Sequence, residues 1–295
     1  ASLPGADGGR LVSRGRVFTG RPPTLWMVTL DARDGAVLDV SDLRRSAEGY
    51  VYEHNPANSD VITVELDDLT GDQDRMIGTY AQVRTTVFDG ETAGADFLAQ
   101  ADEDGHFYYD PVEPAVDDPF AHVHAYHHVT QLSRTFEQTH GHTFDGPALV
   151  TTNYRYADDG TFNNAYFTNN LTGDTLLVFG QGDIDFAYDA DVVAHEFGHS
   201  VIQSVTQMIF DGLMTYDEYG WNIAPGALHE GLADYWSASY HGDPGMGGYL
   251  ASLGAPRDLE HDHACPRHVL GEPHDDGTIV AGMARARRLI LGQEL

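Results

Sequence analysis

The sequence predicts a two-lobed α+β protein, with a β-rich amino-terminal lobe, a helical carboxyl-terminal lobe and one central helix between them. Three observations predict this class. Short β-branched and aromatic runs, separated by Gly- and Asp-rich turns, fill residues 49–111. Apolar residues then recur at helical spacing over residues 121–136. Further helical segments follow at residues 189–208, 227–240 and 277–291.

The composition is that of a globular and strongly acidic chain. The 295 residues are 41% hydrophobic, and 46 acidic residues against 16 basic ones give a formal net charge of −30. This charge excludes a general nucleic-acid binder and a protein that binds anionic membranes, because both need a basic surface. Cys265 is the single cysteine, so no intramolecular disulfide can form. No apolar run approaches the roughly 20 residues of a membrane span, and the first residues show neither an initiator Met nor a signal peptide, which indicates a processed or excised segment.

The β elements are predicted from apolar runs and the turns between them. Residues 25–31 and 35–38 are two short apolar runs around a polar turn, a pattern that predicts a β-hairpin. Residues 61–64 and 82–88 are typical strands of the β-rich stretch. After the first helix, residues 153–186 return to short aromatic and β-branched runs, which predict edge strands and turns beside a cleft.

The helices of the second half have recognisable ends. Asp189 or Asp191 is suited to be the acidic cap of the central helix. The next helix is stopped by Gly242, and the last one ends the chain.

The central predicted helix contains the pattern His195-Glu196-Phe197-Gly198-His199. Residues four apart share one helix face, so both histidines can bind one ion while Glu196 lies beside it. Zn²⁺ lowers the pKa of bound water to about 7, and an adjacent carboxylate can take the proton as the water attacks a carbonyl carbon. A shuffled chain of this composition would contain the pattern about 0.04 times. The pattern therefore indicates peptide hydrolysis; the alternative is a helix whose histidines only satisfy buried polar groups.

A third metal ligand is predicted on the next helix. A catalytic zinc takes three protein ligands and keeps one open position, and Glu230 is suited to complete the set. Asp234 lies four residues on, shares the face of Glu230, and can accept the second ring N–H of a zinc-binding histidine. His229 projects about 100° away from Glu230 on a helix, so we expect it to be a bystander.

These residues resemble the gluzincin zinc metallopeptidases, the clan of thermolysin and fungalysin, in which the two-histidine helix is followed by a Glu-x-x-x-Asp helix. The resemblance covers the chain from about Gly49 to the end. It implies a thermolysin-like two-lobed fold, zinc held by His195, His199 and Glu230, and Glu196 as general base. It also implies an endopeptidase that is secreted and acts on extended proteins or peptides.

The resemblance also divides the chain. Residues 31–35 are similar to the close of the propeptide that precedes such enzymes. We therefore expect residues 1–45 to be the end of a propeptide, residues 46–205 to form the β-rich lobe ending in the zinc-binding helix, and residues 206–295 to form the helical lobe.

Two further segments resemble the parts of the family that bind the substrate and the oxyanion. Residues 163–167 resemble the edge strand that binds extended peptide in thermolysin-like enzymes, with Asn164 and Ala165 at the matching positions; the alternative is an ordinary Asn-rich turn. Residues 271–277 resemble the fungalysin-type segment that supplies a catalytic histidine, which implies that His274 hydrogen-bonds the tetrahedral oxyanion. Glu272 or Asp275 can orient its ring.

The chain departs from the family in two places. The thermolysin tyrosine that assists the oxyanion falls here on Phe210, which cannot donate a hydrogen bond, so Tyr216 or Tyr219 would replace it or His274 would act alone. The chain also stops about 20 residues after His274, whereas the family continues into further helices. We therefore expect the helical lobe to be incomplete.

Several alternatives stay open. Two histidine clusters are candidates for a second metal site, against histidines that only pack or lie at the surface: His122, His124, His127 and His128, and His261, His263, Cys265 and His268. Asp191 matches a calcium-ligand position of thermolysin, but a helix cap is the favoured interpretation and Ca²⁺ is a secondary candidate. The rival functions are a catalytically silent homologue that acts as a structural or binding module, and a latent proenzyme inhibited by its own amino-terminal stretch. The intact Glu196 argues against a silent site.

Overall fold

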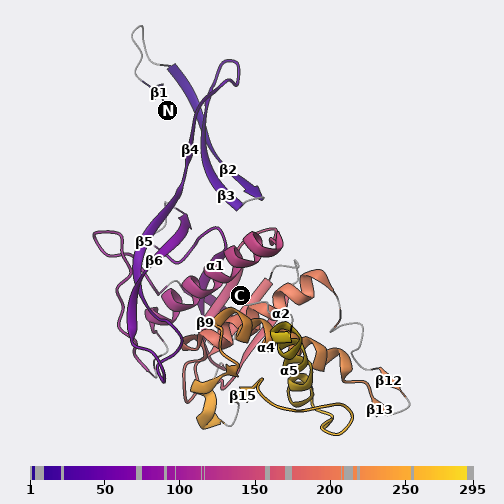
Figure 1. Ribbon diagram of the computed structural model, residues 1–295. Coiled ribbons are helices and arrows are strands. Elements are labelled where there is room, and N and C mark those ends of the chain that lie inside the picture. Colours follow the sequence, from indigo (N-terminus) through magenta and orange to yellow (C-terminus); the bar gives the residue numbers. More distant parts are fainter. Residues whose placement is uncertain are drawn as a thin grey trace.

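The fold is α+β and two-lobed, with the longer strands in the first part of the chain and the helices α2, α4 and α5 in the second (Figure 1). The structure, a computed structural model, describes residues 2–3, 10–20, 23–70, 75–89, 92–96, 98–113, 115, 117–156, 160–169, 175–206, 208, 215–217, 220–253 and 256–290. All statements below concern these residues.

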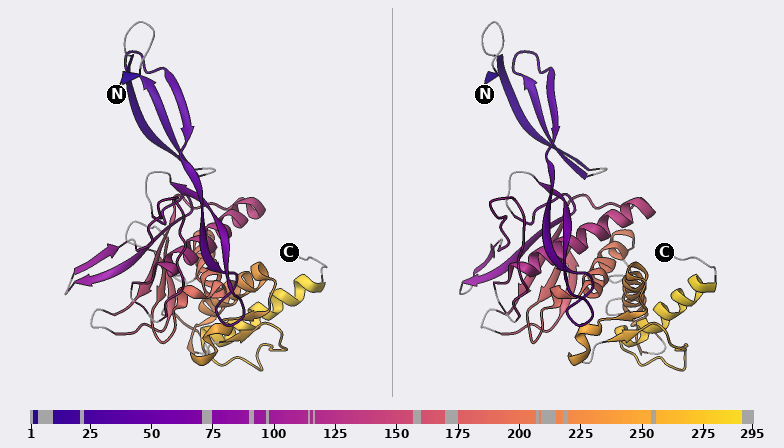
Figure 2. Two further views of the ribbon diagram at one scale, coloured as in Figure 1. Left: turned by 90° about the vertical axis from the view of Figure 1, so that its left-hand side faces the viewer. Right: turned by 60° about the vertical axis from the view of Figure 1, so that its left-hand side comes forward.

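An antiparallel sheet at the amino-terminal end stands away from the rest of the molecule in all three views (Figures 1 and 2). Its strand order is β1-β2-β3-β4, and the strands are β1 (Ser2–Leu3), β2 (Arg10–Gly20), β3 (Pro23–Asp31) and β4 (Val37–Asp42). The predicted hairpin is confirmed as β3 and β4, which turn at Gly35 with a positive φ of 74°. Leu11, Val37 and Val40 remain exposed on this sheet.

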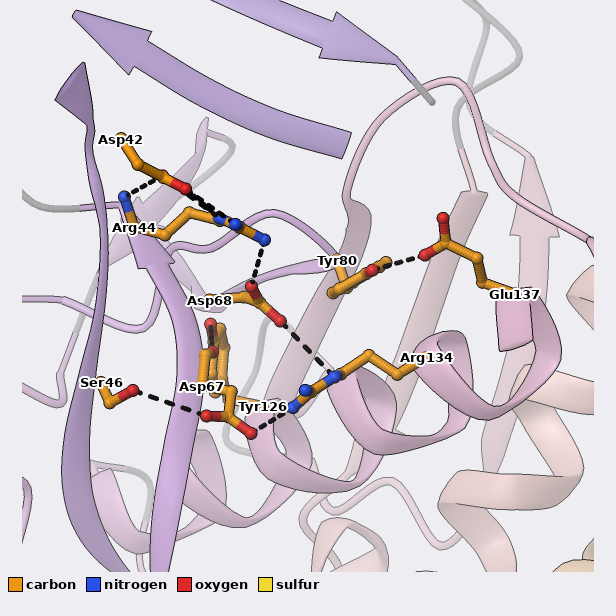
Figure 3. A network of polar contacts seen from close by, with 9 residues as sticks. All are labelled: Asp42, Arg44, Ser46, Asp67, Asp68, Tyr80, Tyr126, Arg134 and Glu137. Atoms are coloured by element: carbon orange, nitrogen blue, oxygen red, sulfur yellow. Dashed lines mark hydrogen bonds and ion pairs between the residues drawn. The ribbon is translucent and has the colours of Figure 1, made fainter. Parts of the chain in front are cut away.

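A chain of ion pairs ties the base of this sheet to the first lobe (Figure 3). Arg44, just after β4, contacts Asp42 at 2.7 Å and Asp68 at 3.1 Å. Arg134 contacts Asp67 and, at 3.7 Å, the other oxygen of Asp68. Asp67 and Asp68 lie at the end of the β-hairpin that follows β4, and Arg134 lies on the first long helix. The two arginines therefore join Asp42, this hairpin and this helix.

That hairpin and a mixed sheet form the β-rich lobe. The hairpin pairs β5 (Arg44–Tyr52) with β6 (Val61–Thr70). The mixed sheet has the order β10-β11-β9-β7-β8, in which β10 is an edge strand. Its members are β7 (Ala81–Asp89), β8 (Thr92–Asp96), β9 (Ala148–Tyr154), β10 (Ala165–Asn169) and β11 (Thr175–Gly180). The pairs β7–β9 and β9–β11 are parallel, and the two outer pairs are antiparallel.

The core of this lobe lies between the sheets and the helix α1 (Pro119–His140). Asp118 caps the helix, because its carboxylate accepts hydrogen bonds from the backbone N–H groups of Phe120 and Ala121. Phe120 and Tyr126 of α1 are fully buried in the same core as Val150 of β9. The predicted helix over 121–136 is confirmed, and the observed helix runs from Pro119 to His140, beyond the predicted range at both ends.

The carboxyl-terminal part of the chain is built around three long helices and short connecting elements. The helices are α2 (Ala190–Val205), α4 (Ala224–His241) and α5 (Pro273–Ile290). The short helix η1 (Phe186–Tyr188) precedes α2. Between the three helices lie β12 (Tyr216–Asp217), β13 (Gly220–Trp221), β14 (Gly245–Met246), η2 (Gly248–Leu253) and β15 (Arg257–Asp258). All three helices agree with the predicted segments to within a few residues. Among the described residues, no helix combines the length and apolar character needed to cross a membrane.

Candidate metal centre

The helix α2 is buried along most of its length, which places its polar residues inside the protein. Asp189 begins it, with an extended backbone and a carboxylate that accepts a hydrogen bond from Asp191 N at 3.0 Å. His195, Glu196 and His199 are only 5, 6 and 8% exposed. Buried polar side chains need partners or a ligand. These three therefore call for a specific partner.

The helix α4 packs closely across α2 and supplies that partner. A Cβ built on Gly198 would lie 3.2 Å from the Cα of Ala233, so a side chain larger than hydrogen at this position would push the helices apart. This approach brings Glu230 and Asp234 of α4 next to the histidines of α2.

Three side chains converge on one point with the spacing of metal ligands. Glu230 Oε2 lies 3.2 Å from His195 Nε2 and 3.5 Å from His199 Nε2. A tetrahedral Zn²⁺ with bonds of about 2.0–2.1 Å keeps its ligands roughly 3.3 Å apart, so the separations match. Glu230 Oε2 is also buried and accepts no hydrogen bond from the described residues. Within the described part of the chain, this is the one group of three such residues whose ligand atoms lie within 4.8 Å of one another, and it could hold a metal ion.

The electrostatics of the cluster favour a bound cation. Burial alone would lower the pKa of His195, but the carboxylates of Asp234 and Glu230 raise it to about 10. Burial likewise raises the pKa of Glu230, but His195 and His199 outweigh it and hold that pKa far below its usual range. The carboxylate of Glu230 is therefore stable beside the two histidines only with a positive charge between them. A proton or a metal ion can supply that charge.

The carboxylate of Asp234 links the cluster to a residue that the sequence analysis missed. Asp234 is fully buried, and its Oδ1 lies 2.7 Å from His195 Nδ1. Arg257 of β15 donates two hydrogen bonds of 2.7 Å to the same carboxylate, from Nε and Nη2. Burial raises the pKa of Asp234, but His195 and Arg257 hold it below its usual value. Arg257 stands 23 residues after Asp234 in a segment of sequence without a recognisable pattern, so no sequence signal pointed to it.

The interpretation of His229 as a bystander is wrong. Its Nδ1 lies 2.5 Å from His199 Nδ1, and the two rings stack with centroids 4.6 Å apart. The expected 100° separation on α4 is real, but α2 and α4 approach so closely that both His229 and Glu230 reach α2. His229 is buried, and its other ring nitrogen has no hydrogen-bond partner among the described residues.

Glu196 lies beside the cluster on α2 without belonging to it. Its Oε2 is buried and has no hydrogen-bond partner among the described residues. Burial raises the pKa of its carboxyl group. A buried carboxylate with a raised pKa and a free lone pair is suited to exchange a proton with a bound molecule.

The first turn of α5 brings His274 to the same site. Its Nε2 lies 3.5 Å from Glu230 Oε2, and its Nδ1 lies 2.8 Å from Glu272 Oε1. The sequence left Glu272 and Asp275 as alternatives for orienting this ring, and the contact is with Glu272. The ring is 54% exposed, so its outer face is open to a bound molecule.

The sequence profile of the thermolysin metallopeptidase catalytic domain matches residues 38–203, more than half of the chain. The chain belongs to the thermolysin metallopeptidase family. It is therefore a thermolysin-like gluzincin domain, of a family whose metal is zinc. The matched segment includes the metal-binding residues of α2 but ends before Glu230, so the residues of α4, β15 and α5 are assigned to the site from the geometry alone. None of the curated proteins matches the chain.

The edge strand of this thermolysin-family domain begins at the predicted peptide-binding residues. Asn164 is exposed directly before β10, and Ala165 is its first residue and pairs with Phe179 of β11. Asn164 O accepts a hydrogen bond from Gly180 N at 2.9 Å, which anchors the start of the strand. Asn164 itself lies in the irregular segment directly before the strand, and Ala165 is the first residue of the strand.

The other residues named from the sequence lie outside the metal centre. Phe210 and Tyr219 fall outside the described residues, and Tyr216 in β12 is 74% exposed. The clusters around His122 and His261 form no group with metal-ligand spacing among the described residues. His122 instead contacts Thr85 Oγ1 at 2.8 Å in the core.

Asp191 lies in the first turn of α2 as a nearly buried residue. The capping side chain is that of Asp189, which accepts the hydrogen bond from Asp191 N. Burial, and then the charge of Asp189, raise the pKa of Asp191 to about 8.

Proposed function

We propose that this domain is a zinc-dependent endopeptidase that hydrolyses peptide bonds of extended protein segments. The observation that carries the proposal is the convergence of His195, His199 and Glu230, with the unpartnered carboxylate of Glu196 beside them. A structural zinc site would be closed by a fourth protein ligand, whereas three ligands leave one position for a reacting molecule. Membership in the thermolysin family supports the same chemistry.

The donor set fits zinc better than calcium or magnesium. Two imidazole nitrogens and one carboxylate oxygen are borderline-soft ligands, whereas the hard cations prefer oxygen alone. When bound, zinc would supply Lewis-acid polarisation of the scissile carbonyl and acidify the attacking water. Asp234 would accept the Nδ1–H of His195 and keep its Nε2 lone pair directed to the ion, with Arg257 holding the carboxylate.

Glu196 would transfer the proton of the reaction, and His274 would stabilise the negative charge that develops. Glu196 is proposed as general base: it takes the proton of the attacking water and returns it to the nitrogen of the leaving amine. His274, with Glu272 accepting from its Nδ1, would donate from Nε2 to the developing oxyanion.

An extended substrate would lie along the free edge of β10. The edge strand has unpaired backbone N–H and C=O groups, which pair with a peptide whatever its sequence. Asn164 and Ala165, at the start of this strand, would bind the backbone next to the cleaved bond. Side-chain selection must then come from the surfaces that flank the strand.

We further propose a secreted enzyme whose residues 1–45 are the end of a propeptide, followed by lobes at 46–205 and 206–295. The amino-terminal sheet that stands apart from both lobes supports this division (Figure 2).

A combined zinc and hydrolysis measurement tests the function. The purified protein is expected to contain one zinc per chain and to cleave casein, and chelation is expected to abolish cleavage. Glu196→Gln should retain zinc and lower kcat by about 10³-fold or more, because the proton acceptor is lost. Retention of zinc without any hydrolysis by the unaltered protein would instead support a silent binding module. Unchanged hydrolysis by Glu196→Gln would remove Glu196 from the mechanism.

A further inference from the structure

A polar cleft lies along the last turns of α2, on the carboxyl-terminal side of the candidate metal ligands of that helix. It has a volume of about 460 Å³ and is bounded by α2, by the ends of β10 and β11, and by the loop between α1 and β9. Ser200, Gln203 and Ser204 form its α2 side. Asn169, the last residue of β10, opens onto it. The cleft is therefore continuous with the strand edge proposed to bind the substrate backbone.

The helical repeat fixes how far this cleft lies from the reacting bond. Ser200 and Gln203 follow Glu196 by four and seven residues, so all three share one face of α2. At a rise of 1.5 Å per residue, the two lie about 6 and 10 Å from Glu196 along the axis. An extended peptide advances about 3.3 Å per residue. If the cleaved bond of the peptide lies next to Glu196, the cleft is therefore at the level of the second and third peptide residues from that bond.

The direction of β10 decides on which side of that bond these residues lie. The strand runs from Ala165, at the proposed catalytic end, to Asn169 at the cleft. A peptide that pairs with it in the more stable antiparallel sense runs the opposite way. Its amino-terminal half then lies at Asn169. The cleft would receive a side chain two or three residues before the cleaved bond.

Two lining residues of the cleft, Asp145 and Gln203, offer acceptor oxygens to a bound side chain. Gln203 is 8% exposed, and its Oε1 is buried without a hydrogen-bond partner among the described residues. Asp145, on the loop that forms the opposite wall, is the one lining residue that bears a formal charge, and it is exposed. Ser204 Oγ is already engaged with His142 Nε2 at 3.2 Å. A carboxylate and an unused amide oxygen together suit a cationic, donor-rich side chain.

We propose that this cleft is a specificity subsite for a basic side chain, arginine above all, two or three residues before the cleaved bond. The guanidinium offers several donors in a planar fork, which suit a carboxylate and an amide oxygen together better than the single ammonium of lysine does. The net charge of −30 would also attract cationic segments to the protein. This inference rests on the proposed peptidase function and adds to it a class of substrate.

Matched fluorogenic peptides test the subsite on the zinc-loaded protein. The peptides share one sequence and carry either arginine or its uncharged analogue citrulline, at the second or the third position before the cleaved bond. At one of these positions the arginine peptide is expected to have a kcat/KM about tenfold higher. A ratio near one at both positions would overturn the proposal.

Variants tie the preference to the two acceptors. Asp145→Asn should bring the arginine-to-citrulline ratio close to one, and Gln203→Met should lower it several-fold because the buried acceptor is replaced by a thioether. Asp104→Asn, which removes one exposed carboxylate outside the cleft, should leave the ratio unchanged. A preference that survives Asp145→Asn would contradict the assignment. If no peptide is cleaved, or cleavage survives Glu196→Gln, the peptidase function fails; cleavage without preference removes the subsite alone.

Discussion

His199 and His229 face each other with their Nδ1 atoms 2.5 Å apart, a distance at which one proton can join the two rings in a hydrogen bond. If His199 Nε2 binds zinc, the proton belongs to His199 Nδ1, and His229 Nδ1 accepts it. His229 then carries its own proton on Nε2, which is buried without a partner among the described residues. His229 would therefore fix the tautomer of His199, as we propose that Asp234 does for His195.

Replacing the acceptor of His229 should weaken zinc binding. His229→Phe keeps the ring and loses the acceptor, and we expect zinc affinity to fall about 10- to 100-fold in competition with a chelator. His229→Asn restores an acceptor oxygen at a similar distance along the side chain, so it should recover most of the loss. Equal affinities for both variants would show that the contact only fills space.

Arg257→Lys should lower activity although the charge is kept. Lysine cannot make the two parallel hydrogen bonds that Arg257 makes to Asp234, so the carboxylate becomes free to rotate away from His195. We expect kcat to drop roughly tenfold with a smaller change in KM. Arg285→Lys, at an ion pair with Glu260 away from the cluster, is the matched control and should behave as the parent.

Gly231→Ala should disturb the packing of α5 against α4. An added Cβ would lie 2.3 Å from the carbonyl oxygen of Gly277 and 2.7 Å from Val280 Cβ, so α5, which carries His274, must move. Overpacking of this kind costs roughly 1–3 kcal/mol, measurable by chemical denaturation, and the shift of His274 should reduce kcat further. Gly15→Ala, with nothing within 4 Å of the added atom, should change neither quantity. A Gly231→Ala protein of full stability and activity would mean that α5 does not hold His274 in place.

The buried histidines of α1 should make the fold sensitive to acid. Burial lowers the pKa of His122 and His124 to about 3, so both rings are neutral in the folded protein, whereas in the unfolded chain they titrate near 6.5. A depressed folded-state pKa contributes stability above pH 6.5 that is lost as the pH falls toward 3. At pH 5 the loss is about 2 kcal/mol per ring.

His124→Leu isolates this effect. Both ring nitrogens of His124 are buried without partners among the described residues, so the apolar replacement removes a group that must stay uncharged. Between pH 6.5 and 5 the variant should lose about 2 kcal/mol less unfolding free energy than the parent. His140→Gln, at the exposed end of the same helix, should leave the pH dependence as it is. Parallel pH profiles for His124→Leu and the parent would contradict the assignment.

The sequence by itself determined the secondary-structure elements, and it determined those site residues whose spacing lies within one helix. The spacing of His195 and His199 follows from the helical period, and the cap at Asp189 and the stop at Gly242 follow from backbone preferences, so α2 and α4 could be predicted to within a few residues. Glu230 and Asp234 could be named because their spacing also lies within one helix.

Only the tertiary structure decided which residues meet across elements. His229 was misjudged because its angle on α4 was known but the close approach of α2 at Gly198 was not. Arg257 lies on a two-residue strand without any periodic signal, and only the packing of β15 against α4 brings it to Asp234. The choice of Glu272 over Asp275 as the partner of His274, and the cleft between Asp145 and Gln203, likewise depend on long-range packing. Local backbone chemistry sets helices and caps, whereas contacts between residues distant in the chain arise from side-chain volumes and interhelical distances that no short window of sequence contains.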